Sequence, residues 1–177
     1  MRHDPPSPTT ILDSQVAHRF RVLVVDDTII NLKVLERMLL TRIGVGKVCV
    51  ASSGKKGLEE IEQDDTFNLI FTDIQMPEMD GIEFAKQVLE NYSRKGKTPP
   101  VIIGLTAEVS ESVEVRCLGA GMAEMLHKPI TASQLQNFFD TAAFLNVPNT
   151  YSFDEVEEIP KLPSFSMETD TCHTPVQ

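Results

Sequence analysis

Five short apolar runs, each followed by a segment with helical periodicity, constrain the fold of this chain more than any other feature. Strands that are buried on both faces of a sheet have continuous apolar sequences of this kind. Alternation of strands and helices predicts a parallel sheet that is covered by helices on both faces. We therefore expect a doubly wound α/β fold with a five-stranded parallel sheet. The runs are FRVLVV (20–25), KVCVA (47–51), FNLIFT (67–72), VIIGLT (101–106) and the weaker MAEMLH (122–127).

The segments between and after these runs predict helices. In the first of them, leucine and isoleucine residues recur at helical spacing and Gly44 ends the pattern. Ser53 is suited to cap the second helix, and Pro99 and Pro100 end any helix that precedes the fourth strand. The predicted helices cover residues 28–44, 53–63, 81–92, 110–121 and 131–145.

The two ends of the chain differ in composition from its middle. Residues 1–18 are rich in Pro, Ser and Thr, and residues 146–177 add acidic residues to that composition. Segments of this kind bury too little apolar surface to offset the entropy of ordering them. We therefore expect one domain over residues 19–145, between two disordered segments.

Composition and charge exclude several functions. The chain has 177 residues, a net charge of −10 and no basic stripe, so we expect no direct binding to nucleic acid or to anionic membranes. Its apolar runs fall short of the roughly 20 residues that span a bilayer, and its first residues lack an apolar signal core. Cys49, Cys117 and Cys172 have no spacing typical of a disulfide framework or a zinc site. These features predict a cytoplasmic protein with reduced thiols.

Polar side chains stand at the carboxyl ends of four of the five predicted strands. Asp26 and Asp27 follow the first strand, Asp73 the third, Thr106 ends the fourth and Lys128 follows the fifth. In open parallel sheets these ends share one edge, where function collects. Each residue alone has a simpler interpretation, since acids and hydroxyls cap helices and most lysines are solvated. Their joint placement predicts one shallow cleft.

The chemistry of such a cleft is restricted by its charges. Two carboxylates about 4 Å apart repel by roughly 4 kcal/mol at an effective dielectric of about 20. A hard divalent cation such as Mg²⁺ resolves this conflict. A hydroxyl and an ammonium group suit the oxygens of a phosphoryl group. The cluster therefore indicates a carboxylate nucleophile that accepts phosphate with Mg²⁺.

The motifs that carry these residues resemble those of the receiver domain of response regulators in two-component phosphorelays. They are VLVVDDTIINLKVLERML, FTDIQMPEMDGIEF, VIIGLTA and LHKPI, in the order and spacing of that family, and the resemblance covers about residues 20–145. The chain is most similar to receivers of hybrid histidine kinases. The resemblance implies a flavodoxin-like fold with strand order 2-1-3-4-5.

The resemblance also implies a site. Asp73 is the expected phosphoacceptor, which takes phosphate from a phosphohistidine on a histidine kinase or a histidine phosphotransfer protein. Asp26, Asp27, Asp73 and the backbone carbonyl of Gln75 are the expected Mg²⁺ ligands. The resemblance further implies that Lys128 pairs with a phosphoryl oxygen.

Further implications of the resemblance concern signalling. Thr106 is the expected switch hydroxyl, and the Lys128–Pro129 peptide bond is expected to be cis. The domain is expected to be a signalling switch or phosphate carrier, not an enzyme, and to assist its own phosphorylation and dephosphorylation. The resemblance also implies that a weak dimer can form, and that its interface would be the face of residues 110–121, 122–127 and 131–145. Met125 departs from the family, which has Tyr or Phe there.

Two alternatives stay open at this point. One is a Mg²⁺-dependent phosphatase with an aspartyl nucleophile, a class that has a second acid where this chain has Gln75. The other is a degenerate receiver that serves only as a binding module. A small phosphodonor distinguishes the three, because only a receiver forms a labile, Mg²⁺-dependent adduct on Asp73 without turning over substrate.

Overall fold

The computed structural model describes residues 20–108, 110–140 and 172–173. The segment 1–18, predicted to be disordered, lies outside these residues. So does the predicted disordered segment 146–177, apart from residues 172–173. The last turns of the helix predicted over residues 131–145 also lie outside the described part of the chain.

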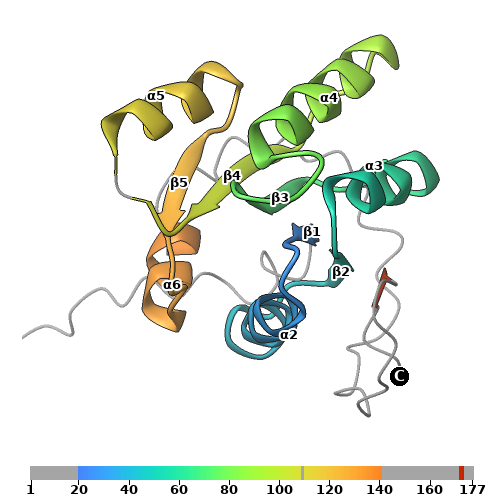
Figure 1. Cartoon of the computed structure of the whole chain (residues 1–177). Coiled ribbons are helices and arrows are strands. Elements are labelled where there is room, and N and C mark those ends of the chain that lie inside the picture. Colours follow the sequence, from blue (N-terminus) through green and yellow to red (C-terminus); the bar gives the residue numbers. More distant parts are fainter. Residues whose placement is uncertain (1–19, 109, 141–171, 174–177) are drawn as a thin grey trace, which may run out of the picture.

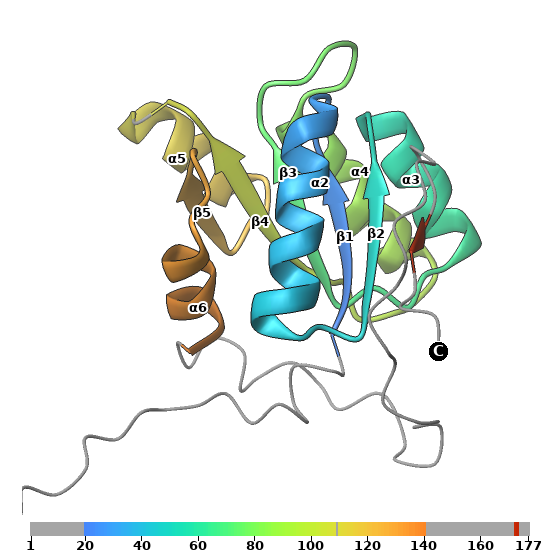
Figure 2. The ribbon, with the colours of Figure 1, turned by 90° about the horizontal axis from the view of Figure 1, so that it is seen from below.

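The sheet has the predicted parallel topology (Figures 1 and 2). Its parallel strands run in the order β5-β4-β3-β1-β2, which is the expected order 2-1-3-4-5. A two-residue strand, β6, pairs antiparallel with β2 and was not predicted. The strands are β1 (Arg21–Val25), β2 (Lys47–Ala51), β3 (Leu69–Asp73), β4 (Val101–Thr106), β5 (Glu124–His127) and β6 (Cys172–His173).

Helices cover both faces of this sheet, and Figure 2 shows α2 and α6 on one side with α3, α4 and α5 on the other. Side chains along β1 alternate between two apolar clusters, with Val22 and Val24 in the first and Leu23 and Val25 in the second. This alternation is the period of two that a strand imposes. The helical segments are α2 (Ile29–Met38), η1 (Leu39–Ile43), α3 (Gly54–Gln63), α4 (Gly81–Arg94), α5 (Glu111–Gly119) and α6 (Ala132–Asp140).

Three helices begin directly after residues whose side chains cap them. Ser53, Asp80 and Ser110 are the N-caps of α3, α4 and α5, and each side chain accepts a hydrogen bond from the backbone N–H three residues further on. These bonds satisfy donors that have no partner within the helix. The caps therefore set where each helix leaves the edge of the sheet that carries the polar residues.

The prediction of one continuous α-helix over residues 28–44 is wrong for its last part. Residues Leu39–Ile43 form a π-helical turn, η1. The N–H of Gly44 reaches back five residues to the carbonyl of Leu39, and Val45 donates to the same carbonyl. Gly44 adopts a left-handed conformation with φ of 80°, which is readily accessible to glycine. The glycine ends the helix as predicted, with a wider last turn.

The cysteines depart in part from expectation. Cys117 is a free, buried thiol, and burial raises its pKa. Cys49 is disulfide-bonded, so the prediction of reduced thiols is wrong for this residue. Cys49 lies on β2 opposite Cys172 in the antiparallel β2–β6 pair, a proximity that sequence spacing does not reveal. None of the helices in the described segments is long and apolar enough to span a bilayer.

An ion cluster ties the strands together at their amino ends, opposite the predicted site. Asp64 accepts hydrogen bonds from Arg21 Nη2 at 2.8 Å and from Lys47 Nζ at 2.7 Å. The hydroxyl and the backbone N–H of Thr66 also donate to it. Burial alone would raise the pKa of Asp64, but these four donors hold it well below its usual range.

We expect the Asp64→Asn substitution to lower the free energy of unfolding by about 1–2 kcal/mol near neutral pH, since it removes a charge that satisfies two cations. The pKa of Asp64 is depressed in the folded protein, so its contribution is present above the ordinary value of 3.8. That contribution is lost as pH falls through the folded-state pKa. Urea denaturation at a series of pH values measures this loss.

The exposed Glu62 on α3 offers a matched control, and Glu62→Gln should leave the free energy of unfolding unchanged within about 0.5 kcal/mol. A difference between wild type and Asp64→Asn that stays constant below pH 3.8 would contradict the assigned role of the carboxylate.

Candidate functional site

The topology brings four strand ends to one edge. Asp26 follows β1, Asp73 ends β3 and Thr106 ends β4, and the register pairs Val25 with Thr72. The backbone N–H of Lys128, just beyond β5, donates to the carbonyl of Thr106 at 2.7 Å. Residues that lie far apart in the sequence therefore meet because β1, β3, β4 and β5 are consecutive neighbours in the sheet.

Three carboxylates gather at this edge. Asp26, Asp27 and Asp73 each offer an oxygen atom, and these atoms lie within 4.8 Å of one another. Asp26 is 1% exposed and Asp73 is 7% exposed, whereas Asp27 is exposed. Like charges at this separation and burial repel one another strongly. The cluster therefore requires compensating positive charge.

Lys128 supplies one compensating charge. Its Nζ lies 2.7 Å from Asp26 Oδ2 and 2.7 Å from Asp73 Oδ2. Burial alone would lower the pKa of Lys128, but the two carboxylates raise it above its ordinary value. The ammonium form is therefore favoured. The Lys128–Pro129 peptide bond is cis, as predicted.

Asp26 is held by a full set of donors. Its Oδ1 accepts from the backbone N–H of Thr28 at 2.8 Å, and Asn31 Nδ2 lies 3.1 Å from both carboxylate oxygens. With Lys128, these donors occupy the acceptor capacity of the group. Asn31 was not among the predicted site residues. The sequence feature that could have indicated it is a polar residue in the first turn of α2, five positions after Asp26.

Asp73 has fewer partners. Among the described residues, its carboxylate accepts only from Lys128 and, at 3.2 Å, from the backbone N–H of Gln75. Burial raises the pKa of Asp73 and the charge of Asp26 adds to the increase, while Lys128 and the Gln75 N–H lower it in part. Asp73 therefore keeps acceptor capacity that Asp26 does not.

Thr106 lies beside this cluster, but its hydroxyl faces its own loop. Oγ1 accepts from the backbone N–H of Glu108 at 3.0 Å and lies 3.2 Å from the Glu108 carbonyl, to which it donates. Within the described segments it has no hydrogen bond to Asp73 or Lys128. The structure thus brings Asp26, Asp27, Asp73 and Lys128 together, and leaves the Thr106 hydroxyl engaged elsewhere.

Met125 lies on β5, at the position where the resemblance implies Tyr or Phe. A Cβ atom added to Gly104 on β4 would lie 2.4 Å from Met125 Sδ. The thioether therefore fills the space above Gly104. The side chain is half-buried and packs against the apolar cluster on that face of the sheet.

Gly81 is needed for close approach. A Cβ atom there would lie 2.2 Å from the carbonyl oxygen of Asp73 and 2.9 Å from Cα of Ile74. The N–H of Gly81 donates to the carbonyl of Ile74 at 3.0 Å. A side chain at this position would push α4 away from the strand end that carries Asp73.

The residues present fit a magnesium ion. Carboxylate oxygens are the ligands that Mg²⁺ prefers in proteins, and it keeps several waters. Asp27 is exposed and Asp73 has spare acceptor capacity, so both are available as ligands. Asp26 would become available if Lys128 moved toward another anion. The arrangement is therefore suited to hold a divalent cation beside a buried, partly satisfied carboxylate.

Comparisons with known proteins identify the domain. The family model of the response regulator receiver domain matches residues 22–140. Hybrid signal transduction histidine kinase L of Dictyostelium discoideum is 36% identical over 118 residues, which are 66% of this chain and 7% of that protein. The chain therefore spans only a small part of this curated relative.

Solved structures agree with this match. One is the complex of the Saccharomyces cerevisiae histidine phosphotransfer protein Ypd1 with the receiver domain of Ssk1, with a TM-score of 0.62, 28% identity and coverage of 68% of this chain and 86% of that chain. Another is the receiver domain of the histidine kinase CKI1 from Arabidopsis thaliana complexed with Mg²⁺. It has a TM-score of 0.58, 32% identity and coverage of 69% of this chain and 92% of that chain.

We expect Gly81→Ala to lower the free energy of unfolding by about 2–3 kcal/mol, because the added methyl group meets rigid backbone atoms. Gly119 on α5 offers a matched control, since a Cβ atom there would meet nothing within 4 Å. Gly119→Ala should leave stability unchanged or raise it slightly. Equal effects of the two substitutions in urea denaturation would contradict the close approach.

Proposed function

This chain belongs to the response regulator receiver domain family, and on that premise we propose that Asp73 accepts a phosphoryl group from a phosphohistidine. The observation that carries the proposal is the position of Asp73. Its carboxylate is buried and lies 2.7 Å from the ammonium group of Lys128. It also accepts fewer hydrogen bonds than Asp26, the other buried carboxylate. A nucleophile needs this combination of a nearby cation and a free lone pair.

Transfer of the phosphoryl group exchanges an N–P bond of the donor for an O–P bond to Asp73. An oxygen of Asp73 attacks phosphorus, the new O–P bond forms as the N–P bond of the donor breaks, and the electron pair of that bond remains on the imidazole. Asp26, Asp27, Asp73 and the Gln75 carbonyl would hold Mg²⁺, which would supply positive charge for the phosphoryl oxygens. Lys128 neutralises a further oxygen. Water later attacks phosphorus and restores the carboxylate with release of inorganic phosphate.

Thr106 connects this chemistry to signalling. Its hydroxyl is engaged with the backbone of Glu108, so a new contact with a phosphoryl oxygen exchanges those bonds and moves the loop before α5. The phosphoryl group biases such a two-state element only through its differential contacts. The domain thereby acts as a cytoplasmic switch or phosphate carrier that assists its own phosphorylation and dephosphorylation.

The donor is a histidine kinase or a histidine phosphotransfer protein. Three apolar side chains lie exposed on the first turns of α2, next to Asp26 and Asp27: Ile29 (46% exposed), Ile30 (71%) and Val34 (50%). A cluster of exposed apolar residues beside a reactive group is typical of a docking surface. A similar receiver was crystallised with the phosphotransfer protein Ypd1, which supports a partner of this class.

We expect the wild-type protein to be labelled by acetyl phosphate or by a phosphorylated phosphotransfer protein. A chelator that removes Mg²⁺ should prevent this labelling. Asp73→Asn should abolish labelling, because the amide is a poor nucleophile. Asp140, which is half-buried at the end of α6 and lies outside the aspartate cluster, offers an Asp→Asn control that should be labelled like the wild type. Undiminished labelling of Asp73→Asn would place the nucleophile elsewhere.

The docking surface has its own test. Ile30→Asp should slow transfer from a phosphotransfer protein at least tenfold, since it places a charge in an apolar contact, and should leave labelling by acetyl phosphate unchanged. Leu118→Asp, on the exposed side of α5, is the matched control and should leave both rates unchanged. Equal slowing of both reactions by Ile30→Asp would show damage to the site rather than loss of docking.

A further inference from the structure

The loop that follows Asp73 rests on a second helix through one side chain. This β3–α4 loop comprises residues 74–80, between the end of β3 and Gly81, the first residue of α4. A Cβ atom added to Gly54, the first residue of α3, would lie 2.8 Å from Met79 Sδ, 3.0 Å from its Cγ and 3.2 Å from its Cβ. The side chain of Met79 therefore lies directly against the backbone of Gly54.

The backbone of this loop is strained next to that contact. Glu78 is the only residue other than glycine with a positive φ, 62°, in the part of the chain that the structure describes. The N–H of Met79 donates to the carbonyl of Pro77 at 2.7 Å and closes a three-residue turn around Glu78. Three-residue turns with a positive φ at the central residue are rare and strained. Such a conformation persists only where neighbouring contacts hold it.

Two contacts join the loop to α3, and they differ in strength. Lys55 Nζ lies 3.5 Å from Glu78 Oε2, but these side chains are 71% and 75% exposed. Exposed ion pairs contribute little to stability. Met79 is half-buried and packs against the apolar cluster that includes Ile74 and Met76. The contact of Met79 with Gly54 is therefore the main attachment of the loop to α3.

The same loop carries a backbone group that reaches the aspartate cluster. The N–H of Gln75 donates to Asp73 Oδ1 at 3.2 Å, and the Gln75 carbonyl is the proposed fourth Mg²⁺ ligand. The side chain of Gln75 is exposed, so packing of that side chain does not fix the backbone at this position. Contacts behind a metal ligand orient it, and their loss lowers metal affinity.

We propose that Met79 is a positioning residue for the aspartate cluster. Its contact with Gly54 attaches the β3–α4 loop to α3 and so holds the Gln75 backbone toward Asp73 and a bound cation. This role rests on the proposed function, since it concerns the same Mg²⁺ site. The base of the loop is closed independently, because the N–H of Gly81 donates to the Ile74 carbonyl at 3.0 Å. Loss of the Met79 contact therefore frees the residues between these two, and leaves β3 and α4 in place.

The test measures the Mg²⁺ affinity of the full chain by NMR titration. Met79→Ala should weaken the affinity roughly tenfold, and should shift the amide signal of Gln75 before Mg²⁺ is added. Met79→Leu nearly conserves the volume of the side chain and should retain the affinity within about twofold. Met38→Ala is the matched control, because Met38 is also half-buried but packs on the other face of the sheet. It should lower the melting temperature and keep the affinity of the wild type.

The Gly54→Ala substitution separates positioning from stability. Alanine is favoured over glycine in a helix, and the three nearest atoms that its Cβ would meet all belong to the flexible side chain of Met79. The variant should therefore melt like the wild type or higher, while the displaced thioether weakens Mg²⁺ binding as Met79→Ala does. Combining the two substitutions should weaken binding no further, because both break one contact. Gly119→Ala is the control for a glycine with open space around it.

Phosphorylation provides a second measurement. At low Mg²⁺, acetyl phosphate should label Met79→Ala more slowly than the wild type, because less of the variant holds the cation. At saturating Mg²⁺ the two rates should agree within about twofold, since the substitution removes no group that touches the phosphoryl group. A deficit that persists at saturating Mg²⁺ would contradict a role through the metal site.

Four other results would overturn the proposal. Met79→Ala might bind Mg²⁺ like the wild type, Met38→Ala might weaken binding equally, or the effects of Gly54→Ala and Met79→Ala might add. Equal weakening by Lys55→Gln would assign the attachment to the exposed ion pair. The proposed function fails separately: a wild-type chain that binds no Mg²⁺ overturns both, whereas a wild type that binds Mg²⁺ and is labelled, beside an unaltered Met79→Ala, overturns the positioning role alone.

Discussion

The site depends on an imbalance of charge. Three carboxylates lie within 4.8 Å of one another at one edge of the sheet, and one ammonium group lies between the two buried ones. The fold sets up this conflict, because the ends of β1 and β3 are neighbours and both continue into acids. Lys128 reaches Asp26 from a position 102 residues further along the chain. The parallel sheet and the helices that cover it hold these charges together.

The sequence predicted the sheet order, the Ser53 cap and the members of the cluster, because each of these follows from a local pattern or from a distinctive motif. It did not predict the π-helical turn before Gly44, which depends on how the last N–H groups share the Leu39 carbonyl. It also missed Asn31, whose contact with Asp26 requires the angle between β1 and α2. The backbone contact at Gly81 is likewise visible only in three dimensions.

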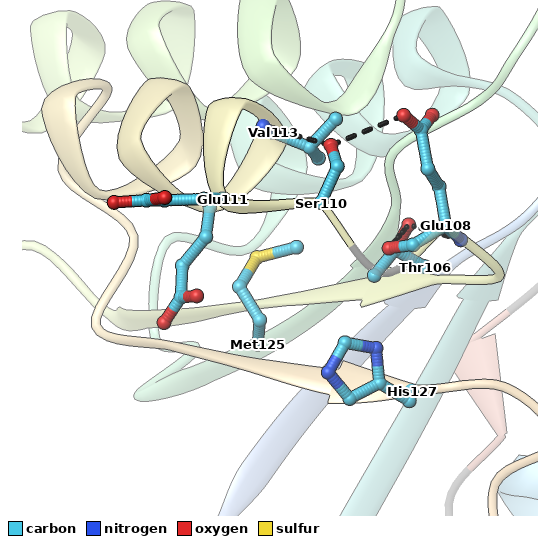
Figure 3. Close-up of a pocket in the computed structure, with 8 residues that line it drawn as sticks. Thr106, Glu108, Ser110, Glu111, Val113, Met125 and His127 are labelled. Carbon is cyan, nitrogen blue, oxygen red and sulfur yellow. Dashed lines mark hydrogen bonds between the residues drawn. The ribbon is translucent and has the colours of Figure 1, made fainter.

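The hydroxyl of Thr106 connects the aspartate cluster with the start of α5. It belongs to the strand end beside Asp73, and it also lines a pocket between α5 and the ends of β4 and β5 (Figure 3). Its partner Glu108 contacts Ser110, the N-cap of α5. A change in the bonds of Thr106 therefore acts on residues that start α5. This path is short and consists of hydrogen bonds, so it needs no large movement of the sheet.

The central claim is that the carboxylate cluster needs a cation, and the free energy of unfolding of Lys128→Met tests it most directly. In a chelator, Lys128→Met should lose about 2–3 kcal/mol relative to wild type, because it leaves the two buried carboxylates without a neighbouring cation. Millimolar Mg²⁺ should recover most of that loss. Lys97→Met, which breaks the exposed pair with Asp65, should lose less and should not respond to Mg²⁺. An equal loss for Lys128→Met with and without Mg²⁺, or no loss in the chelator, would contradict the claim.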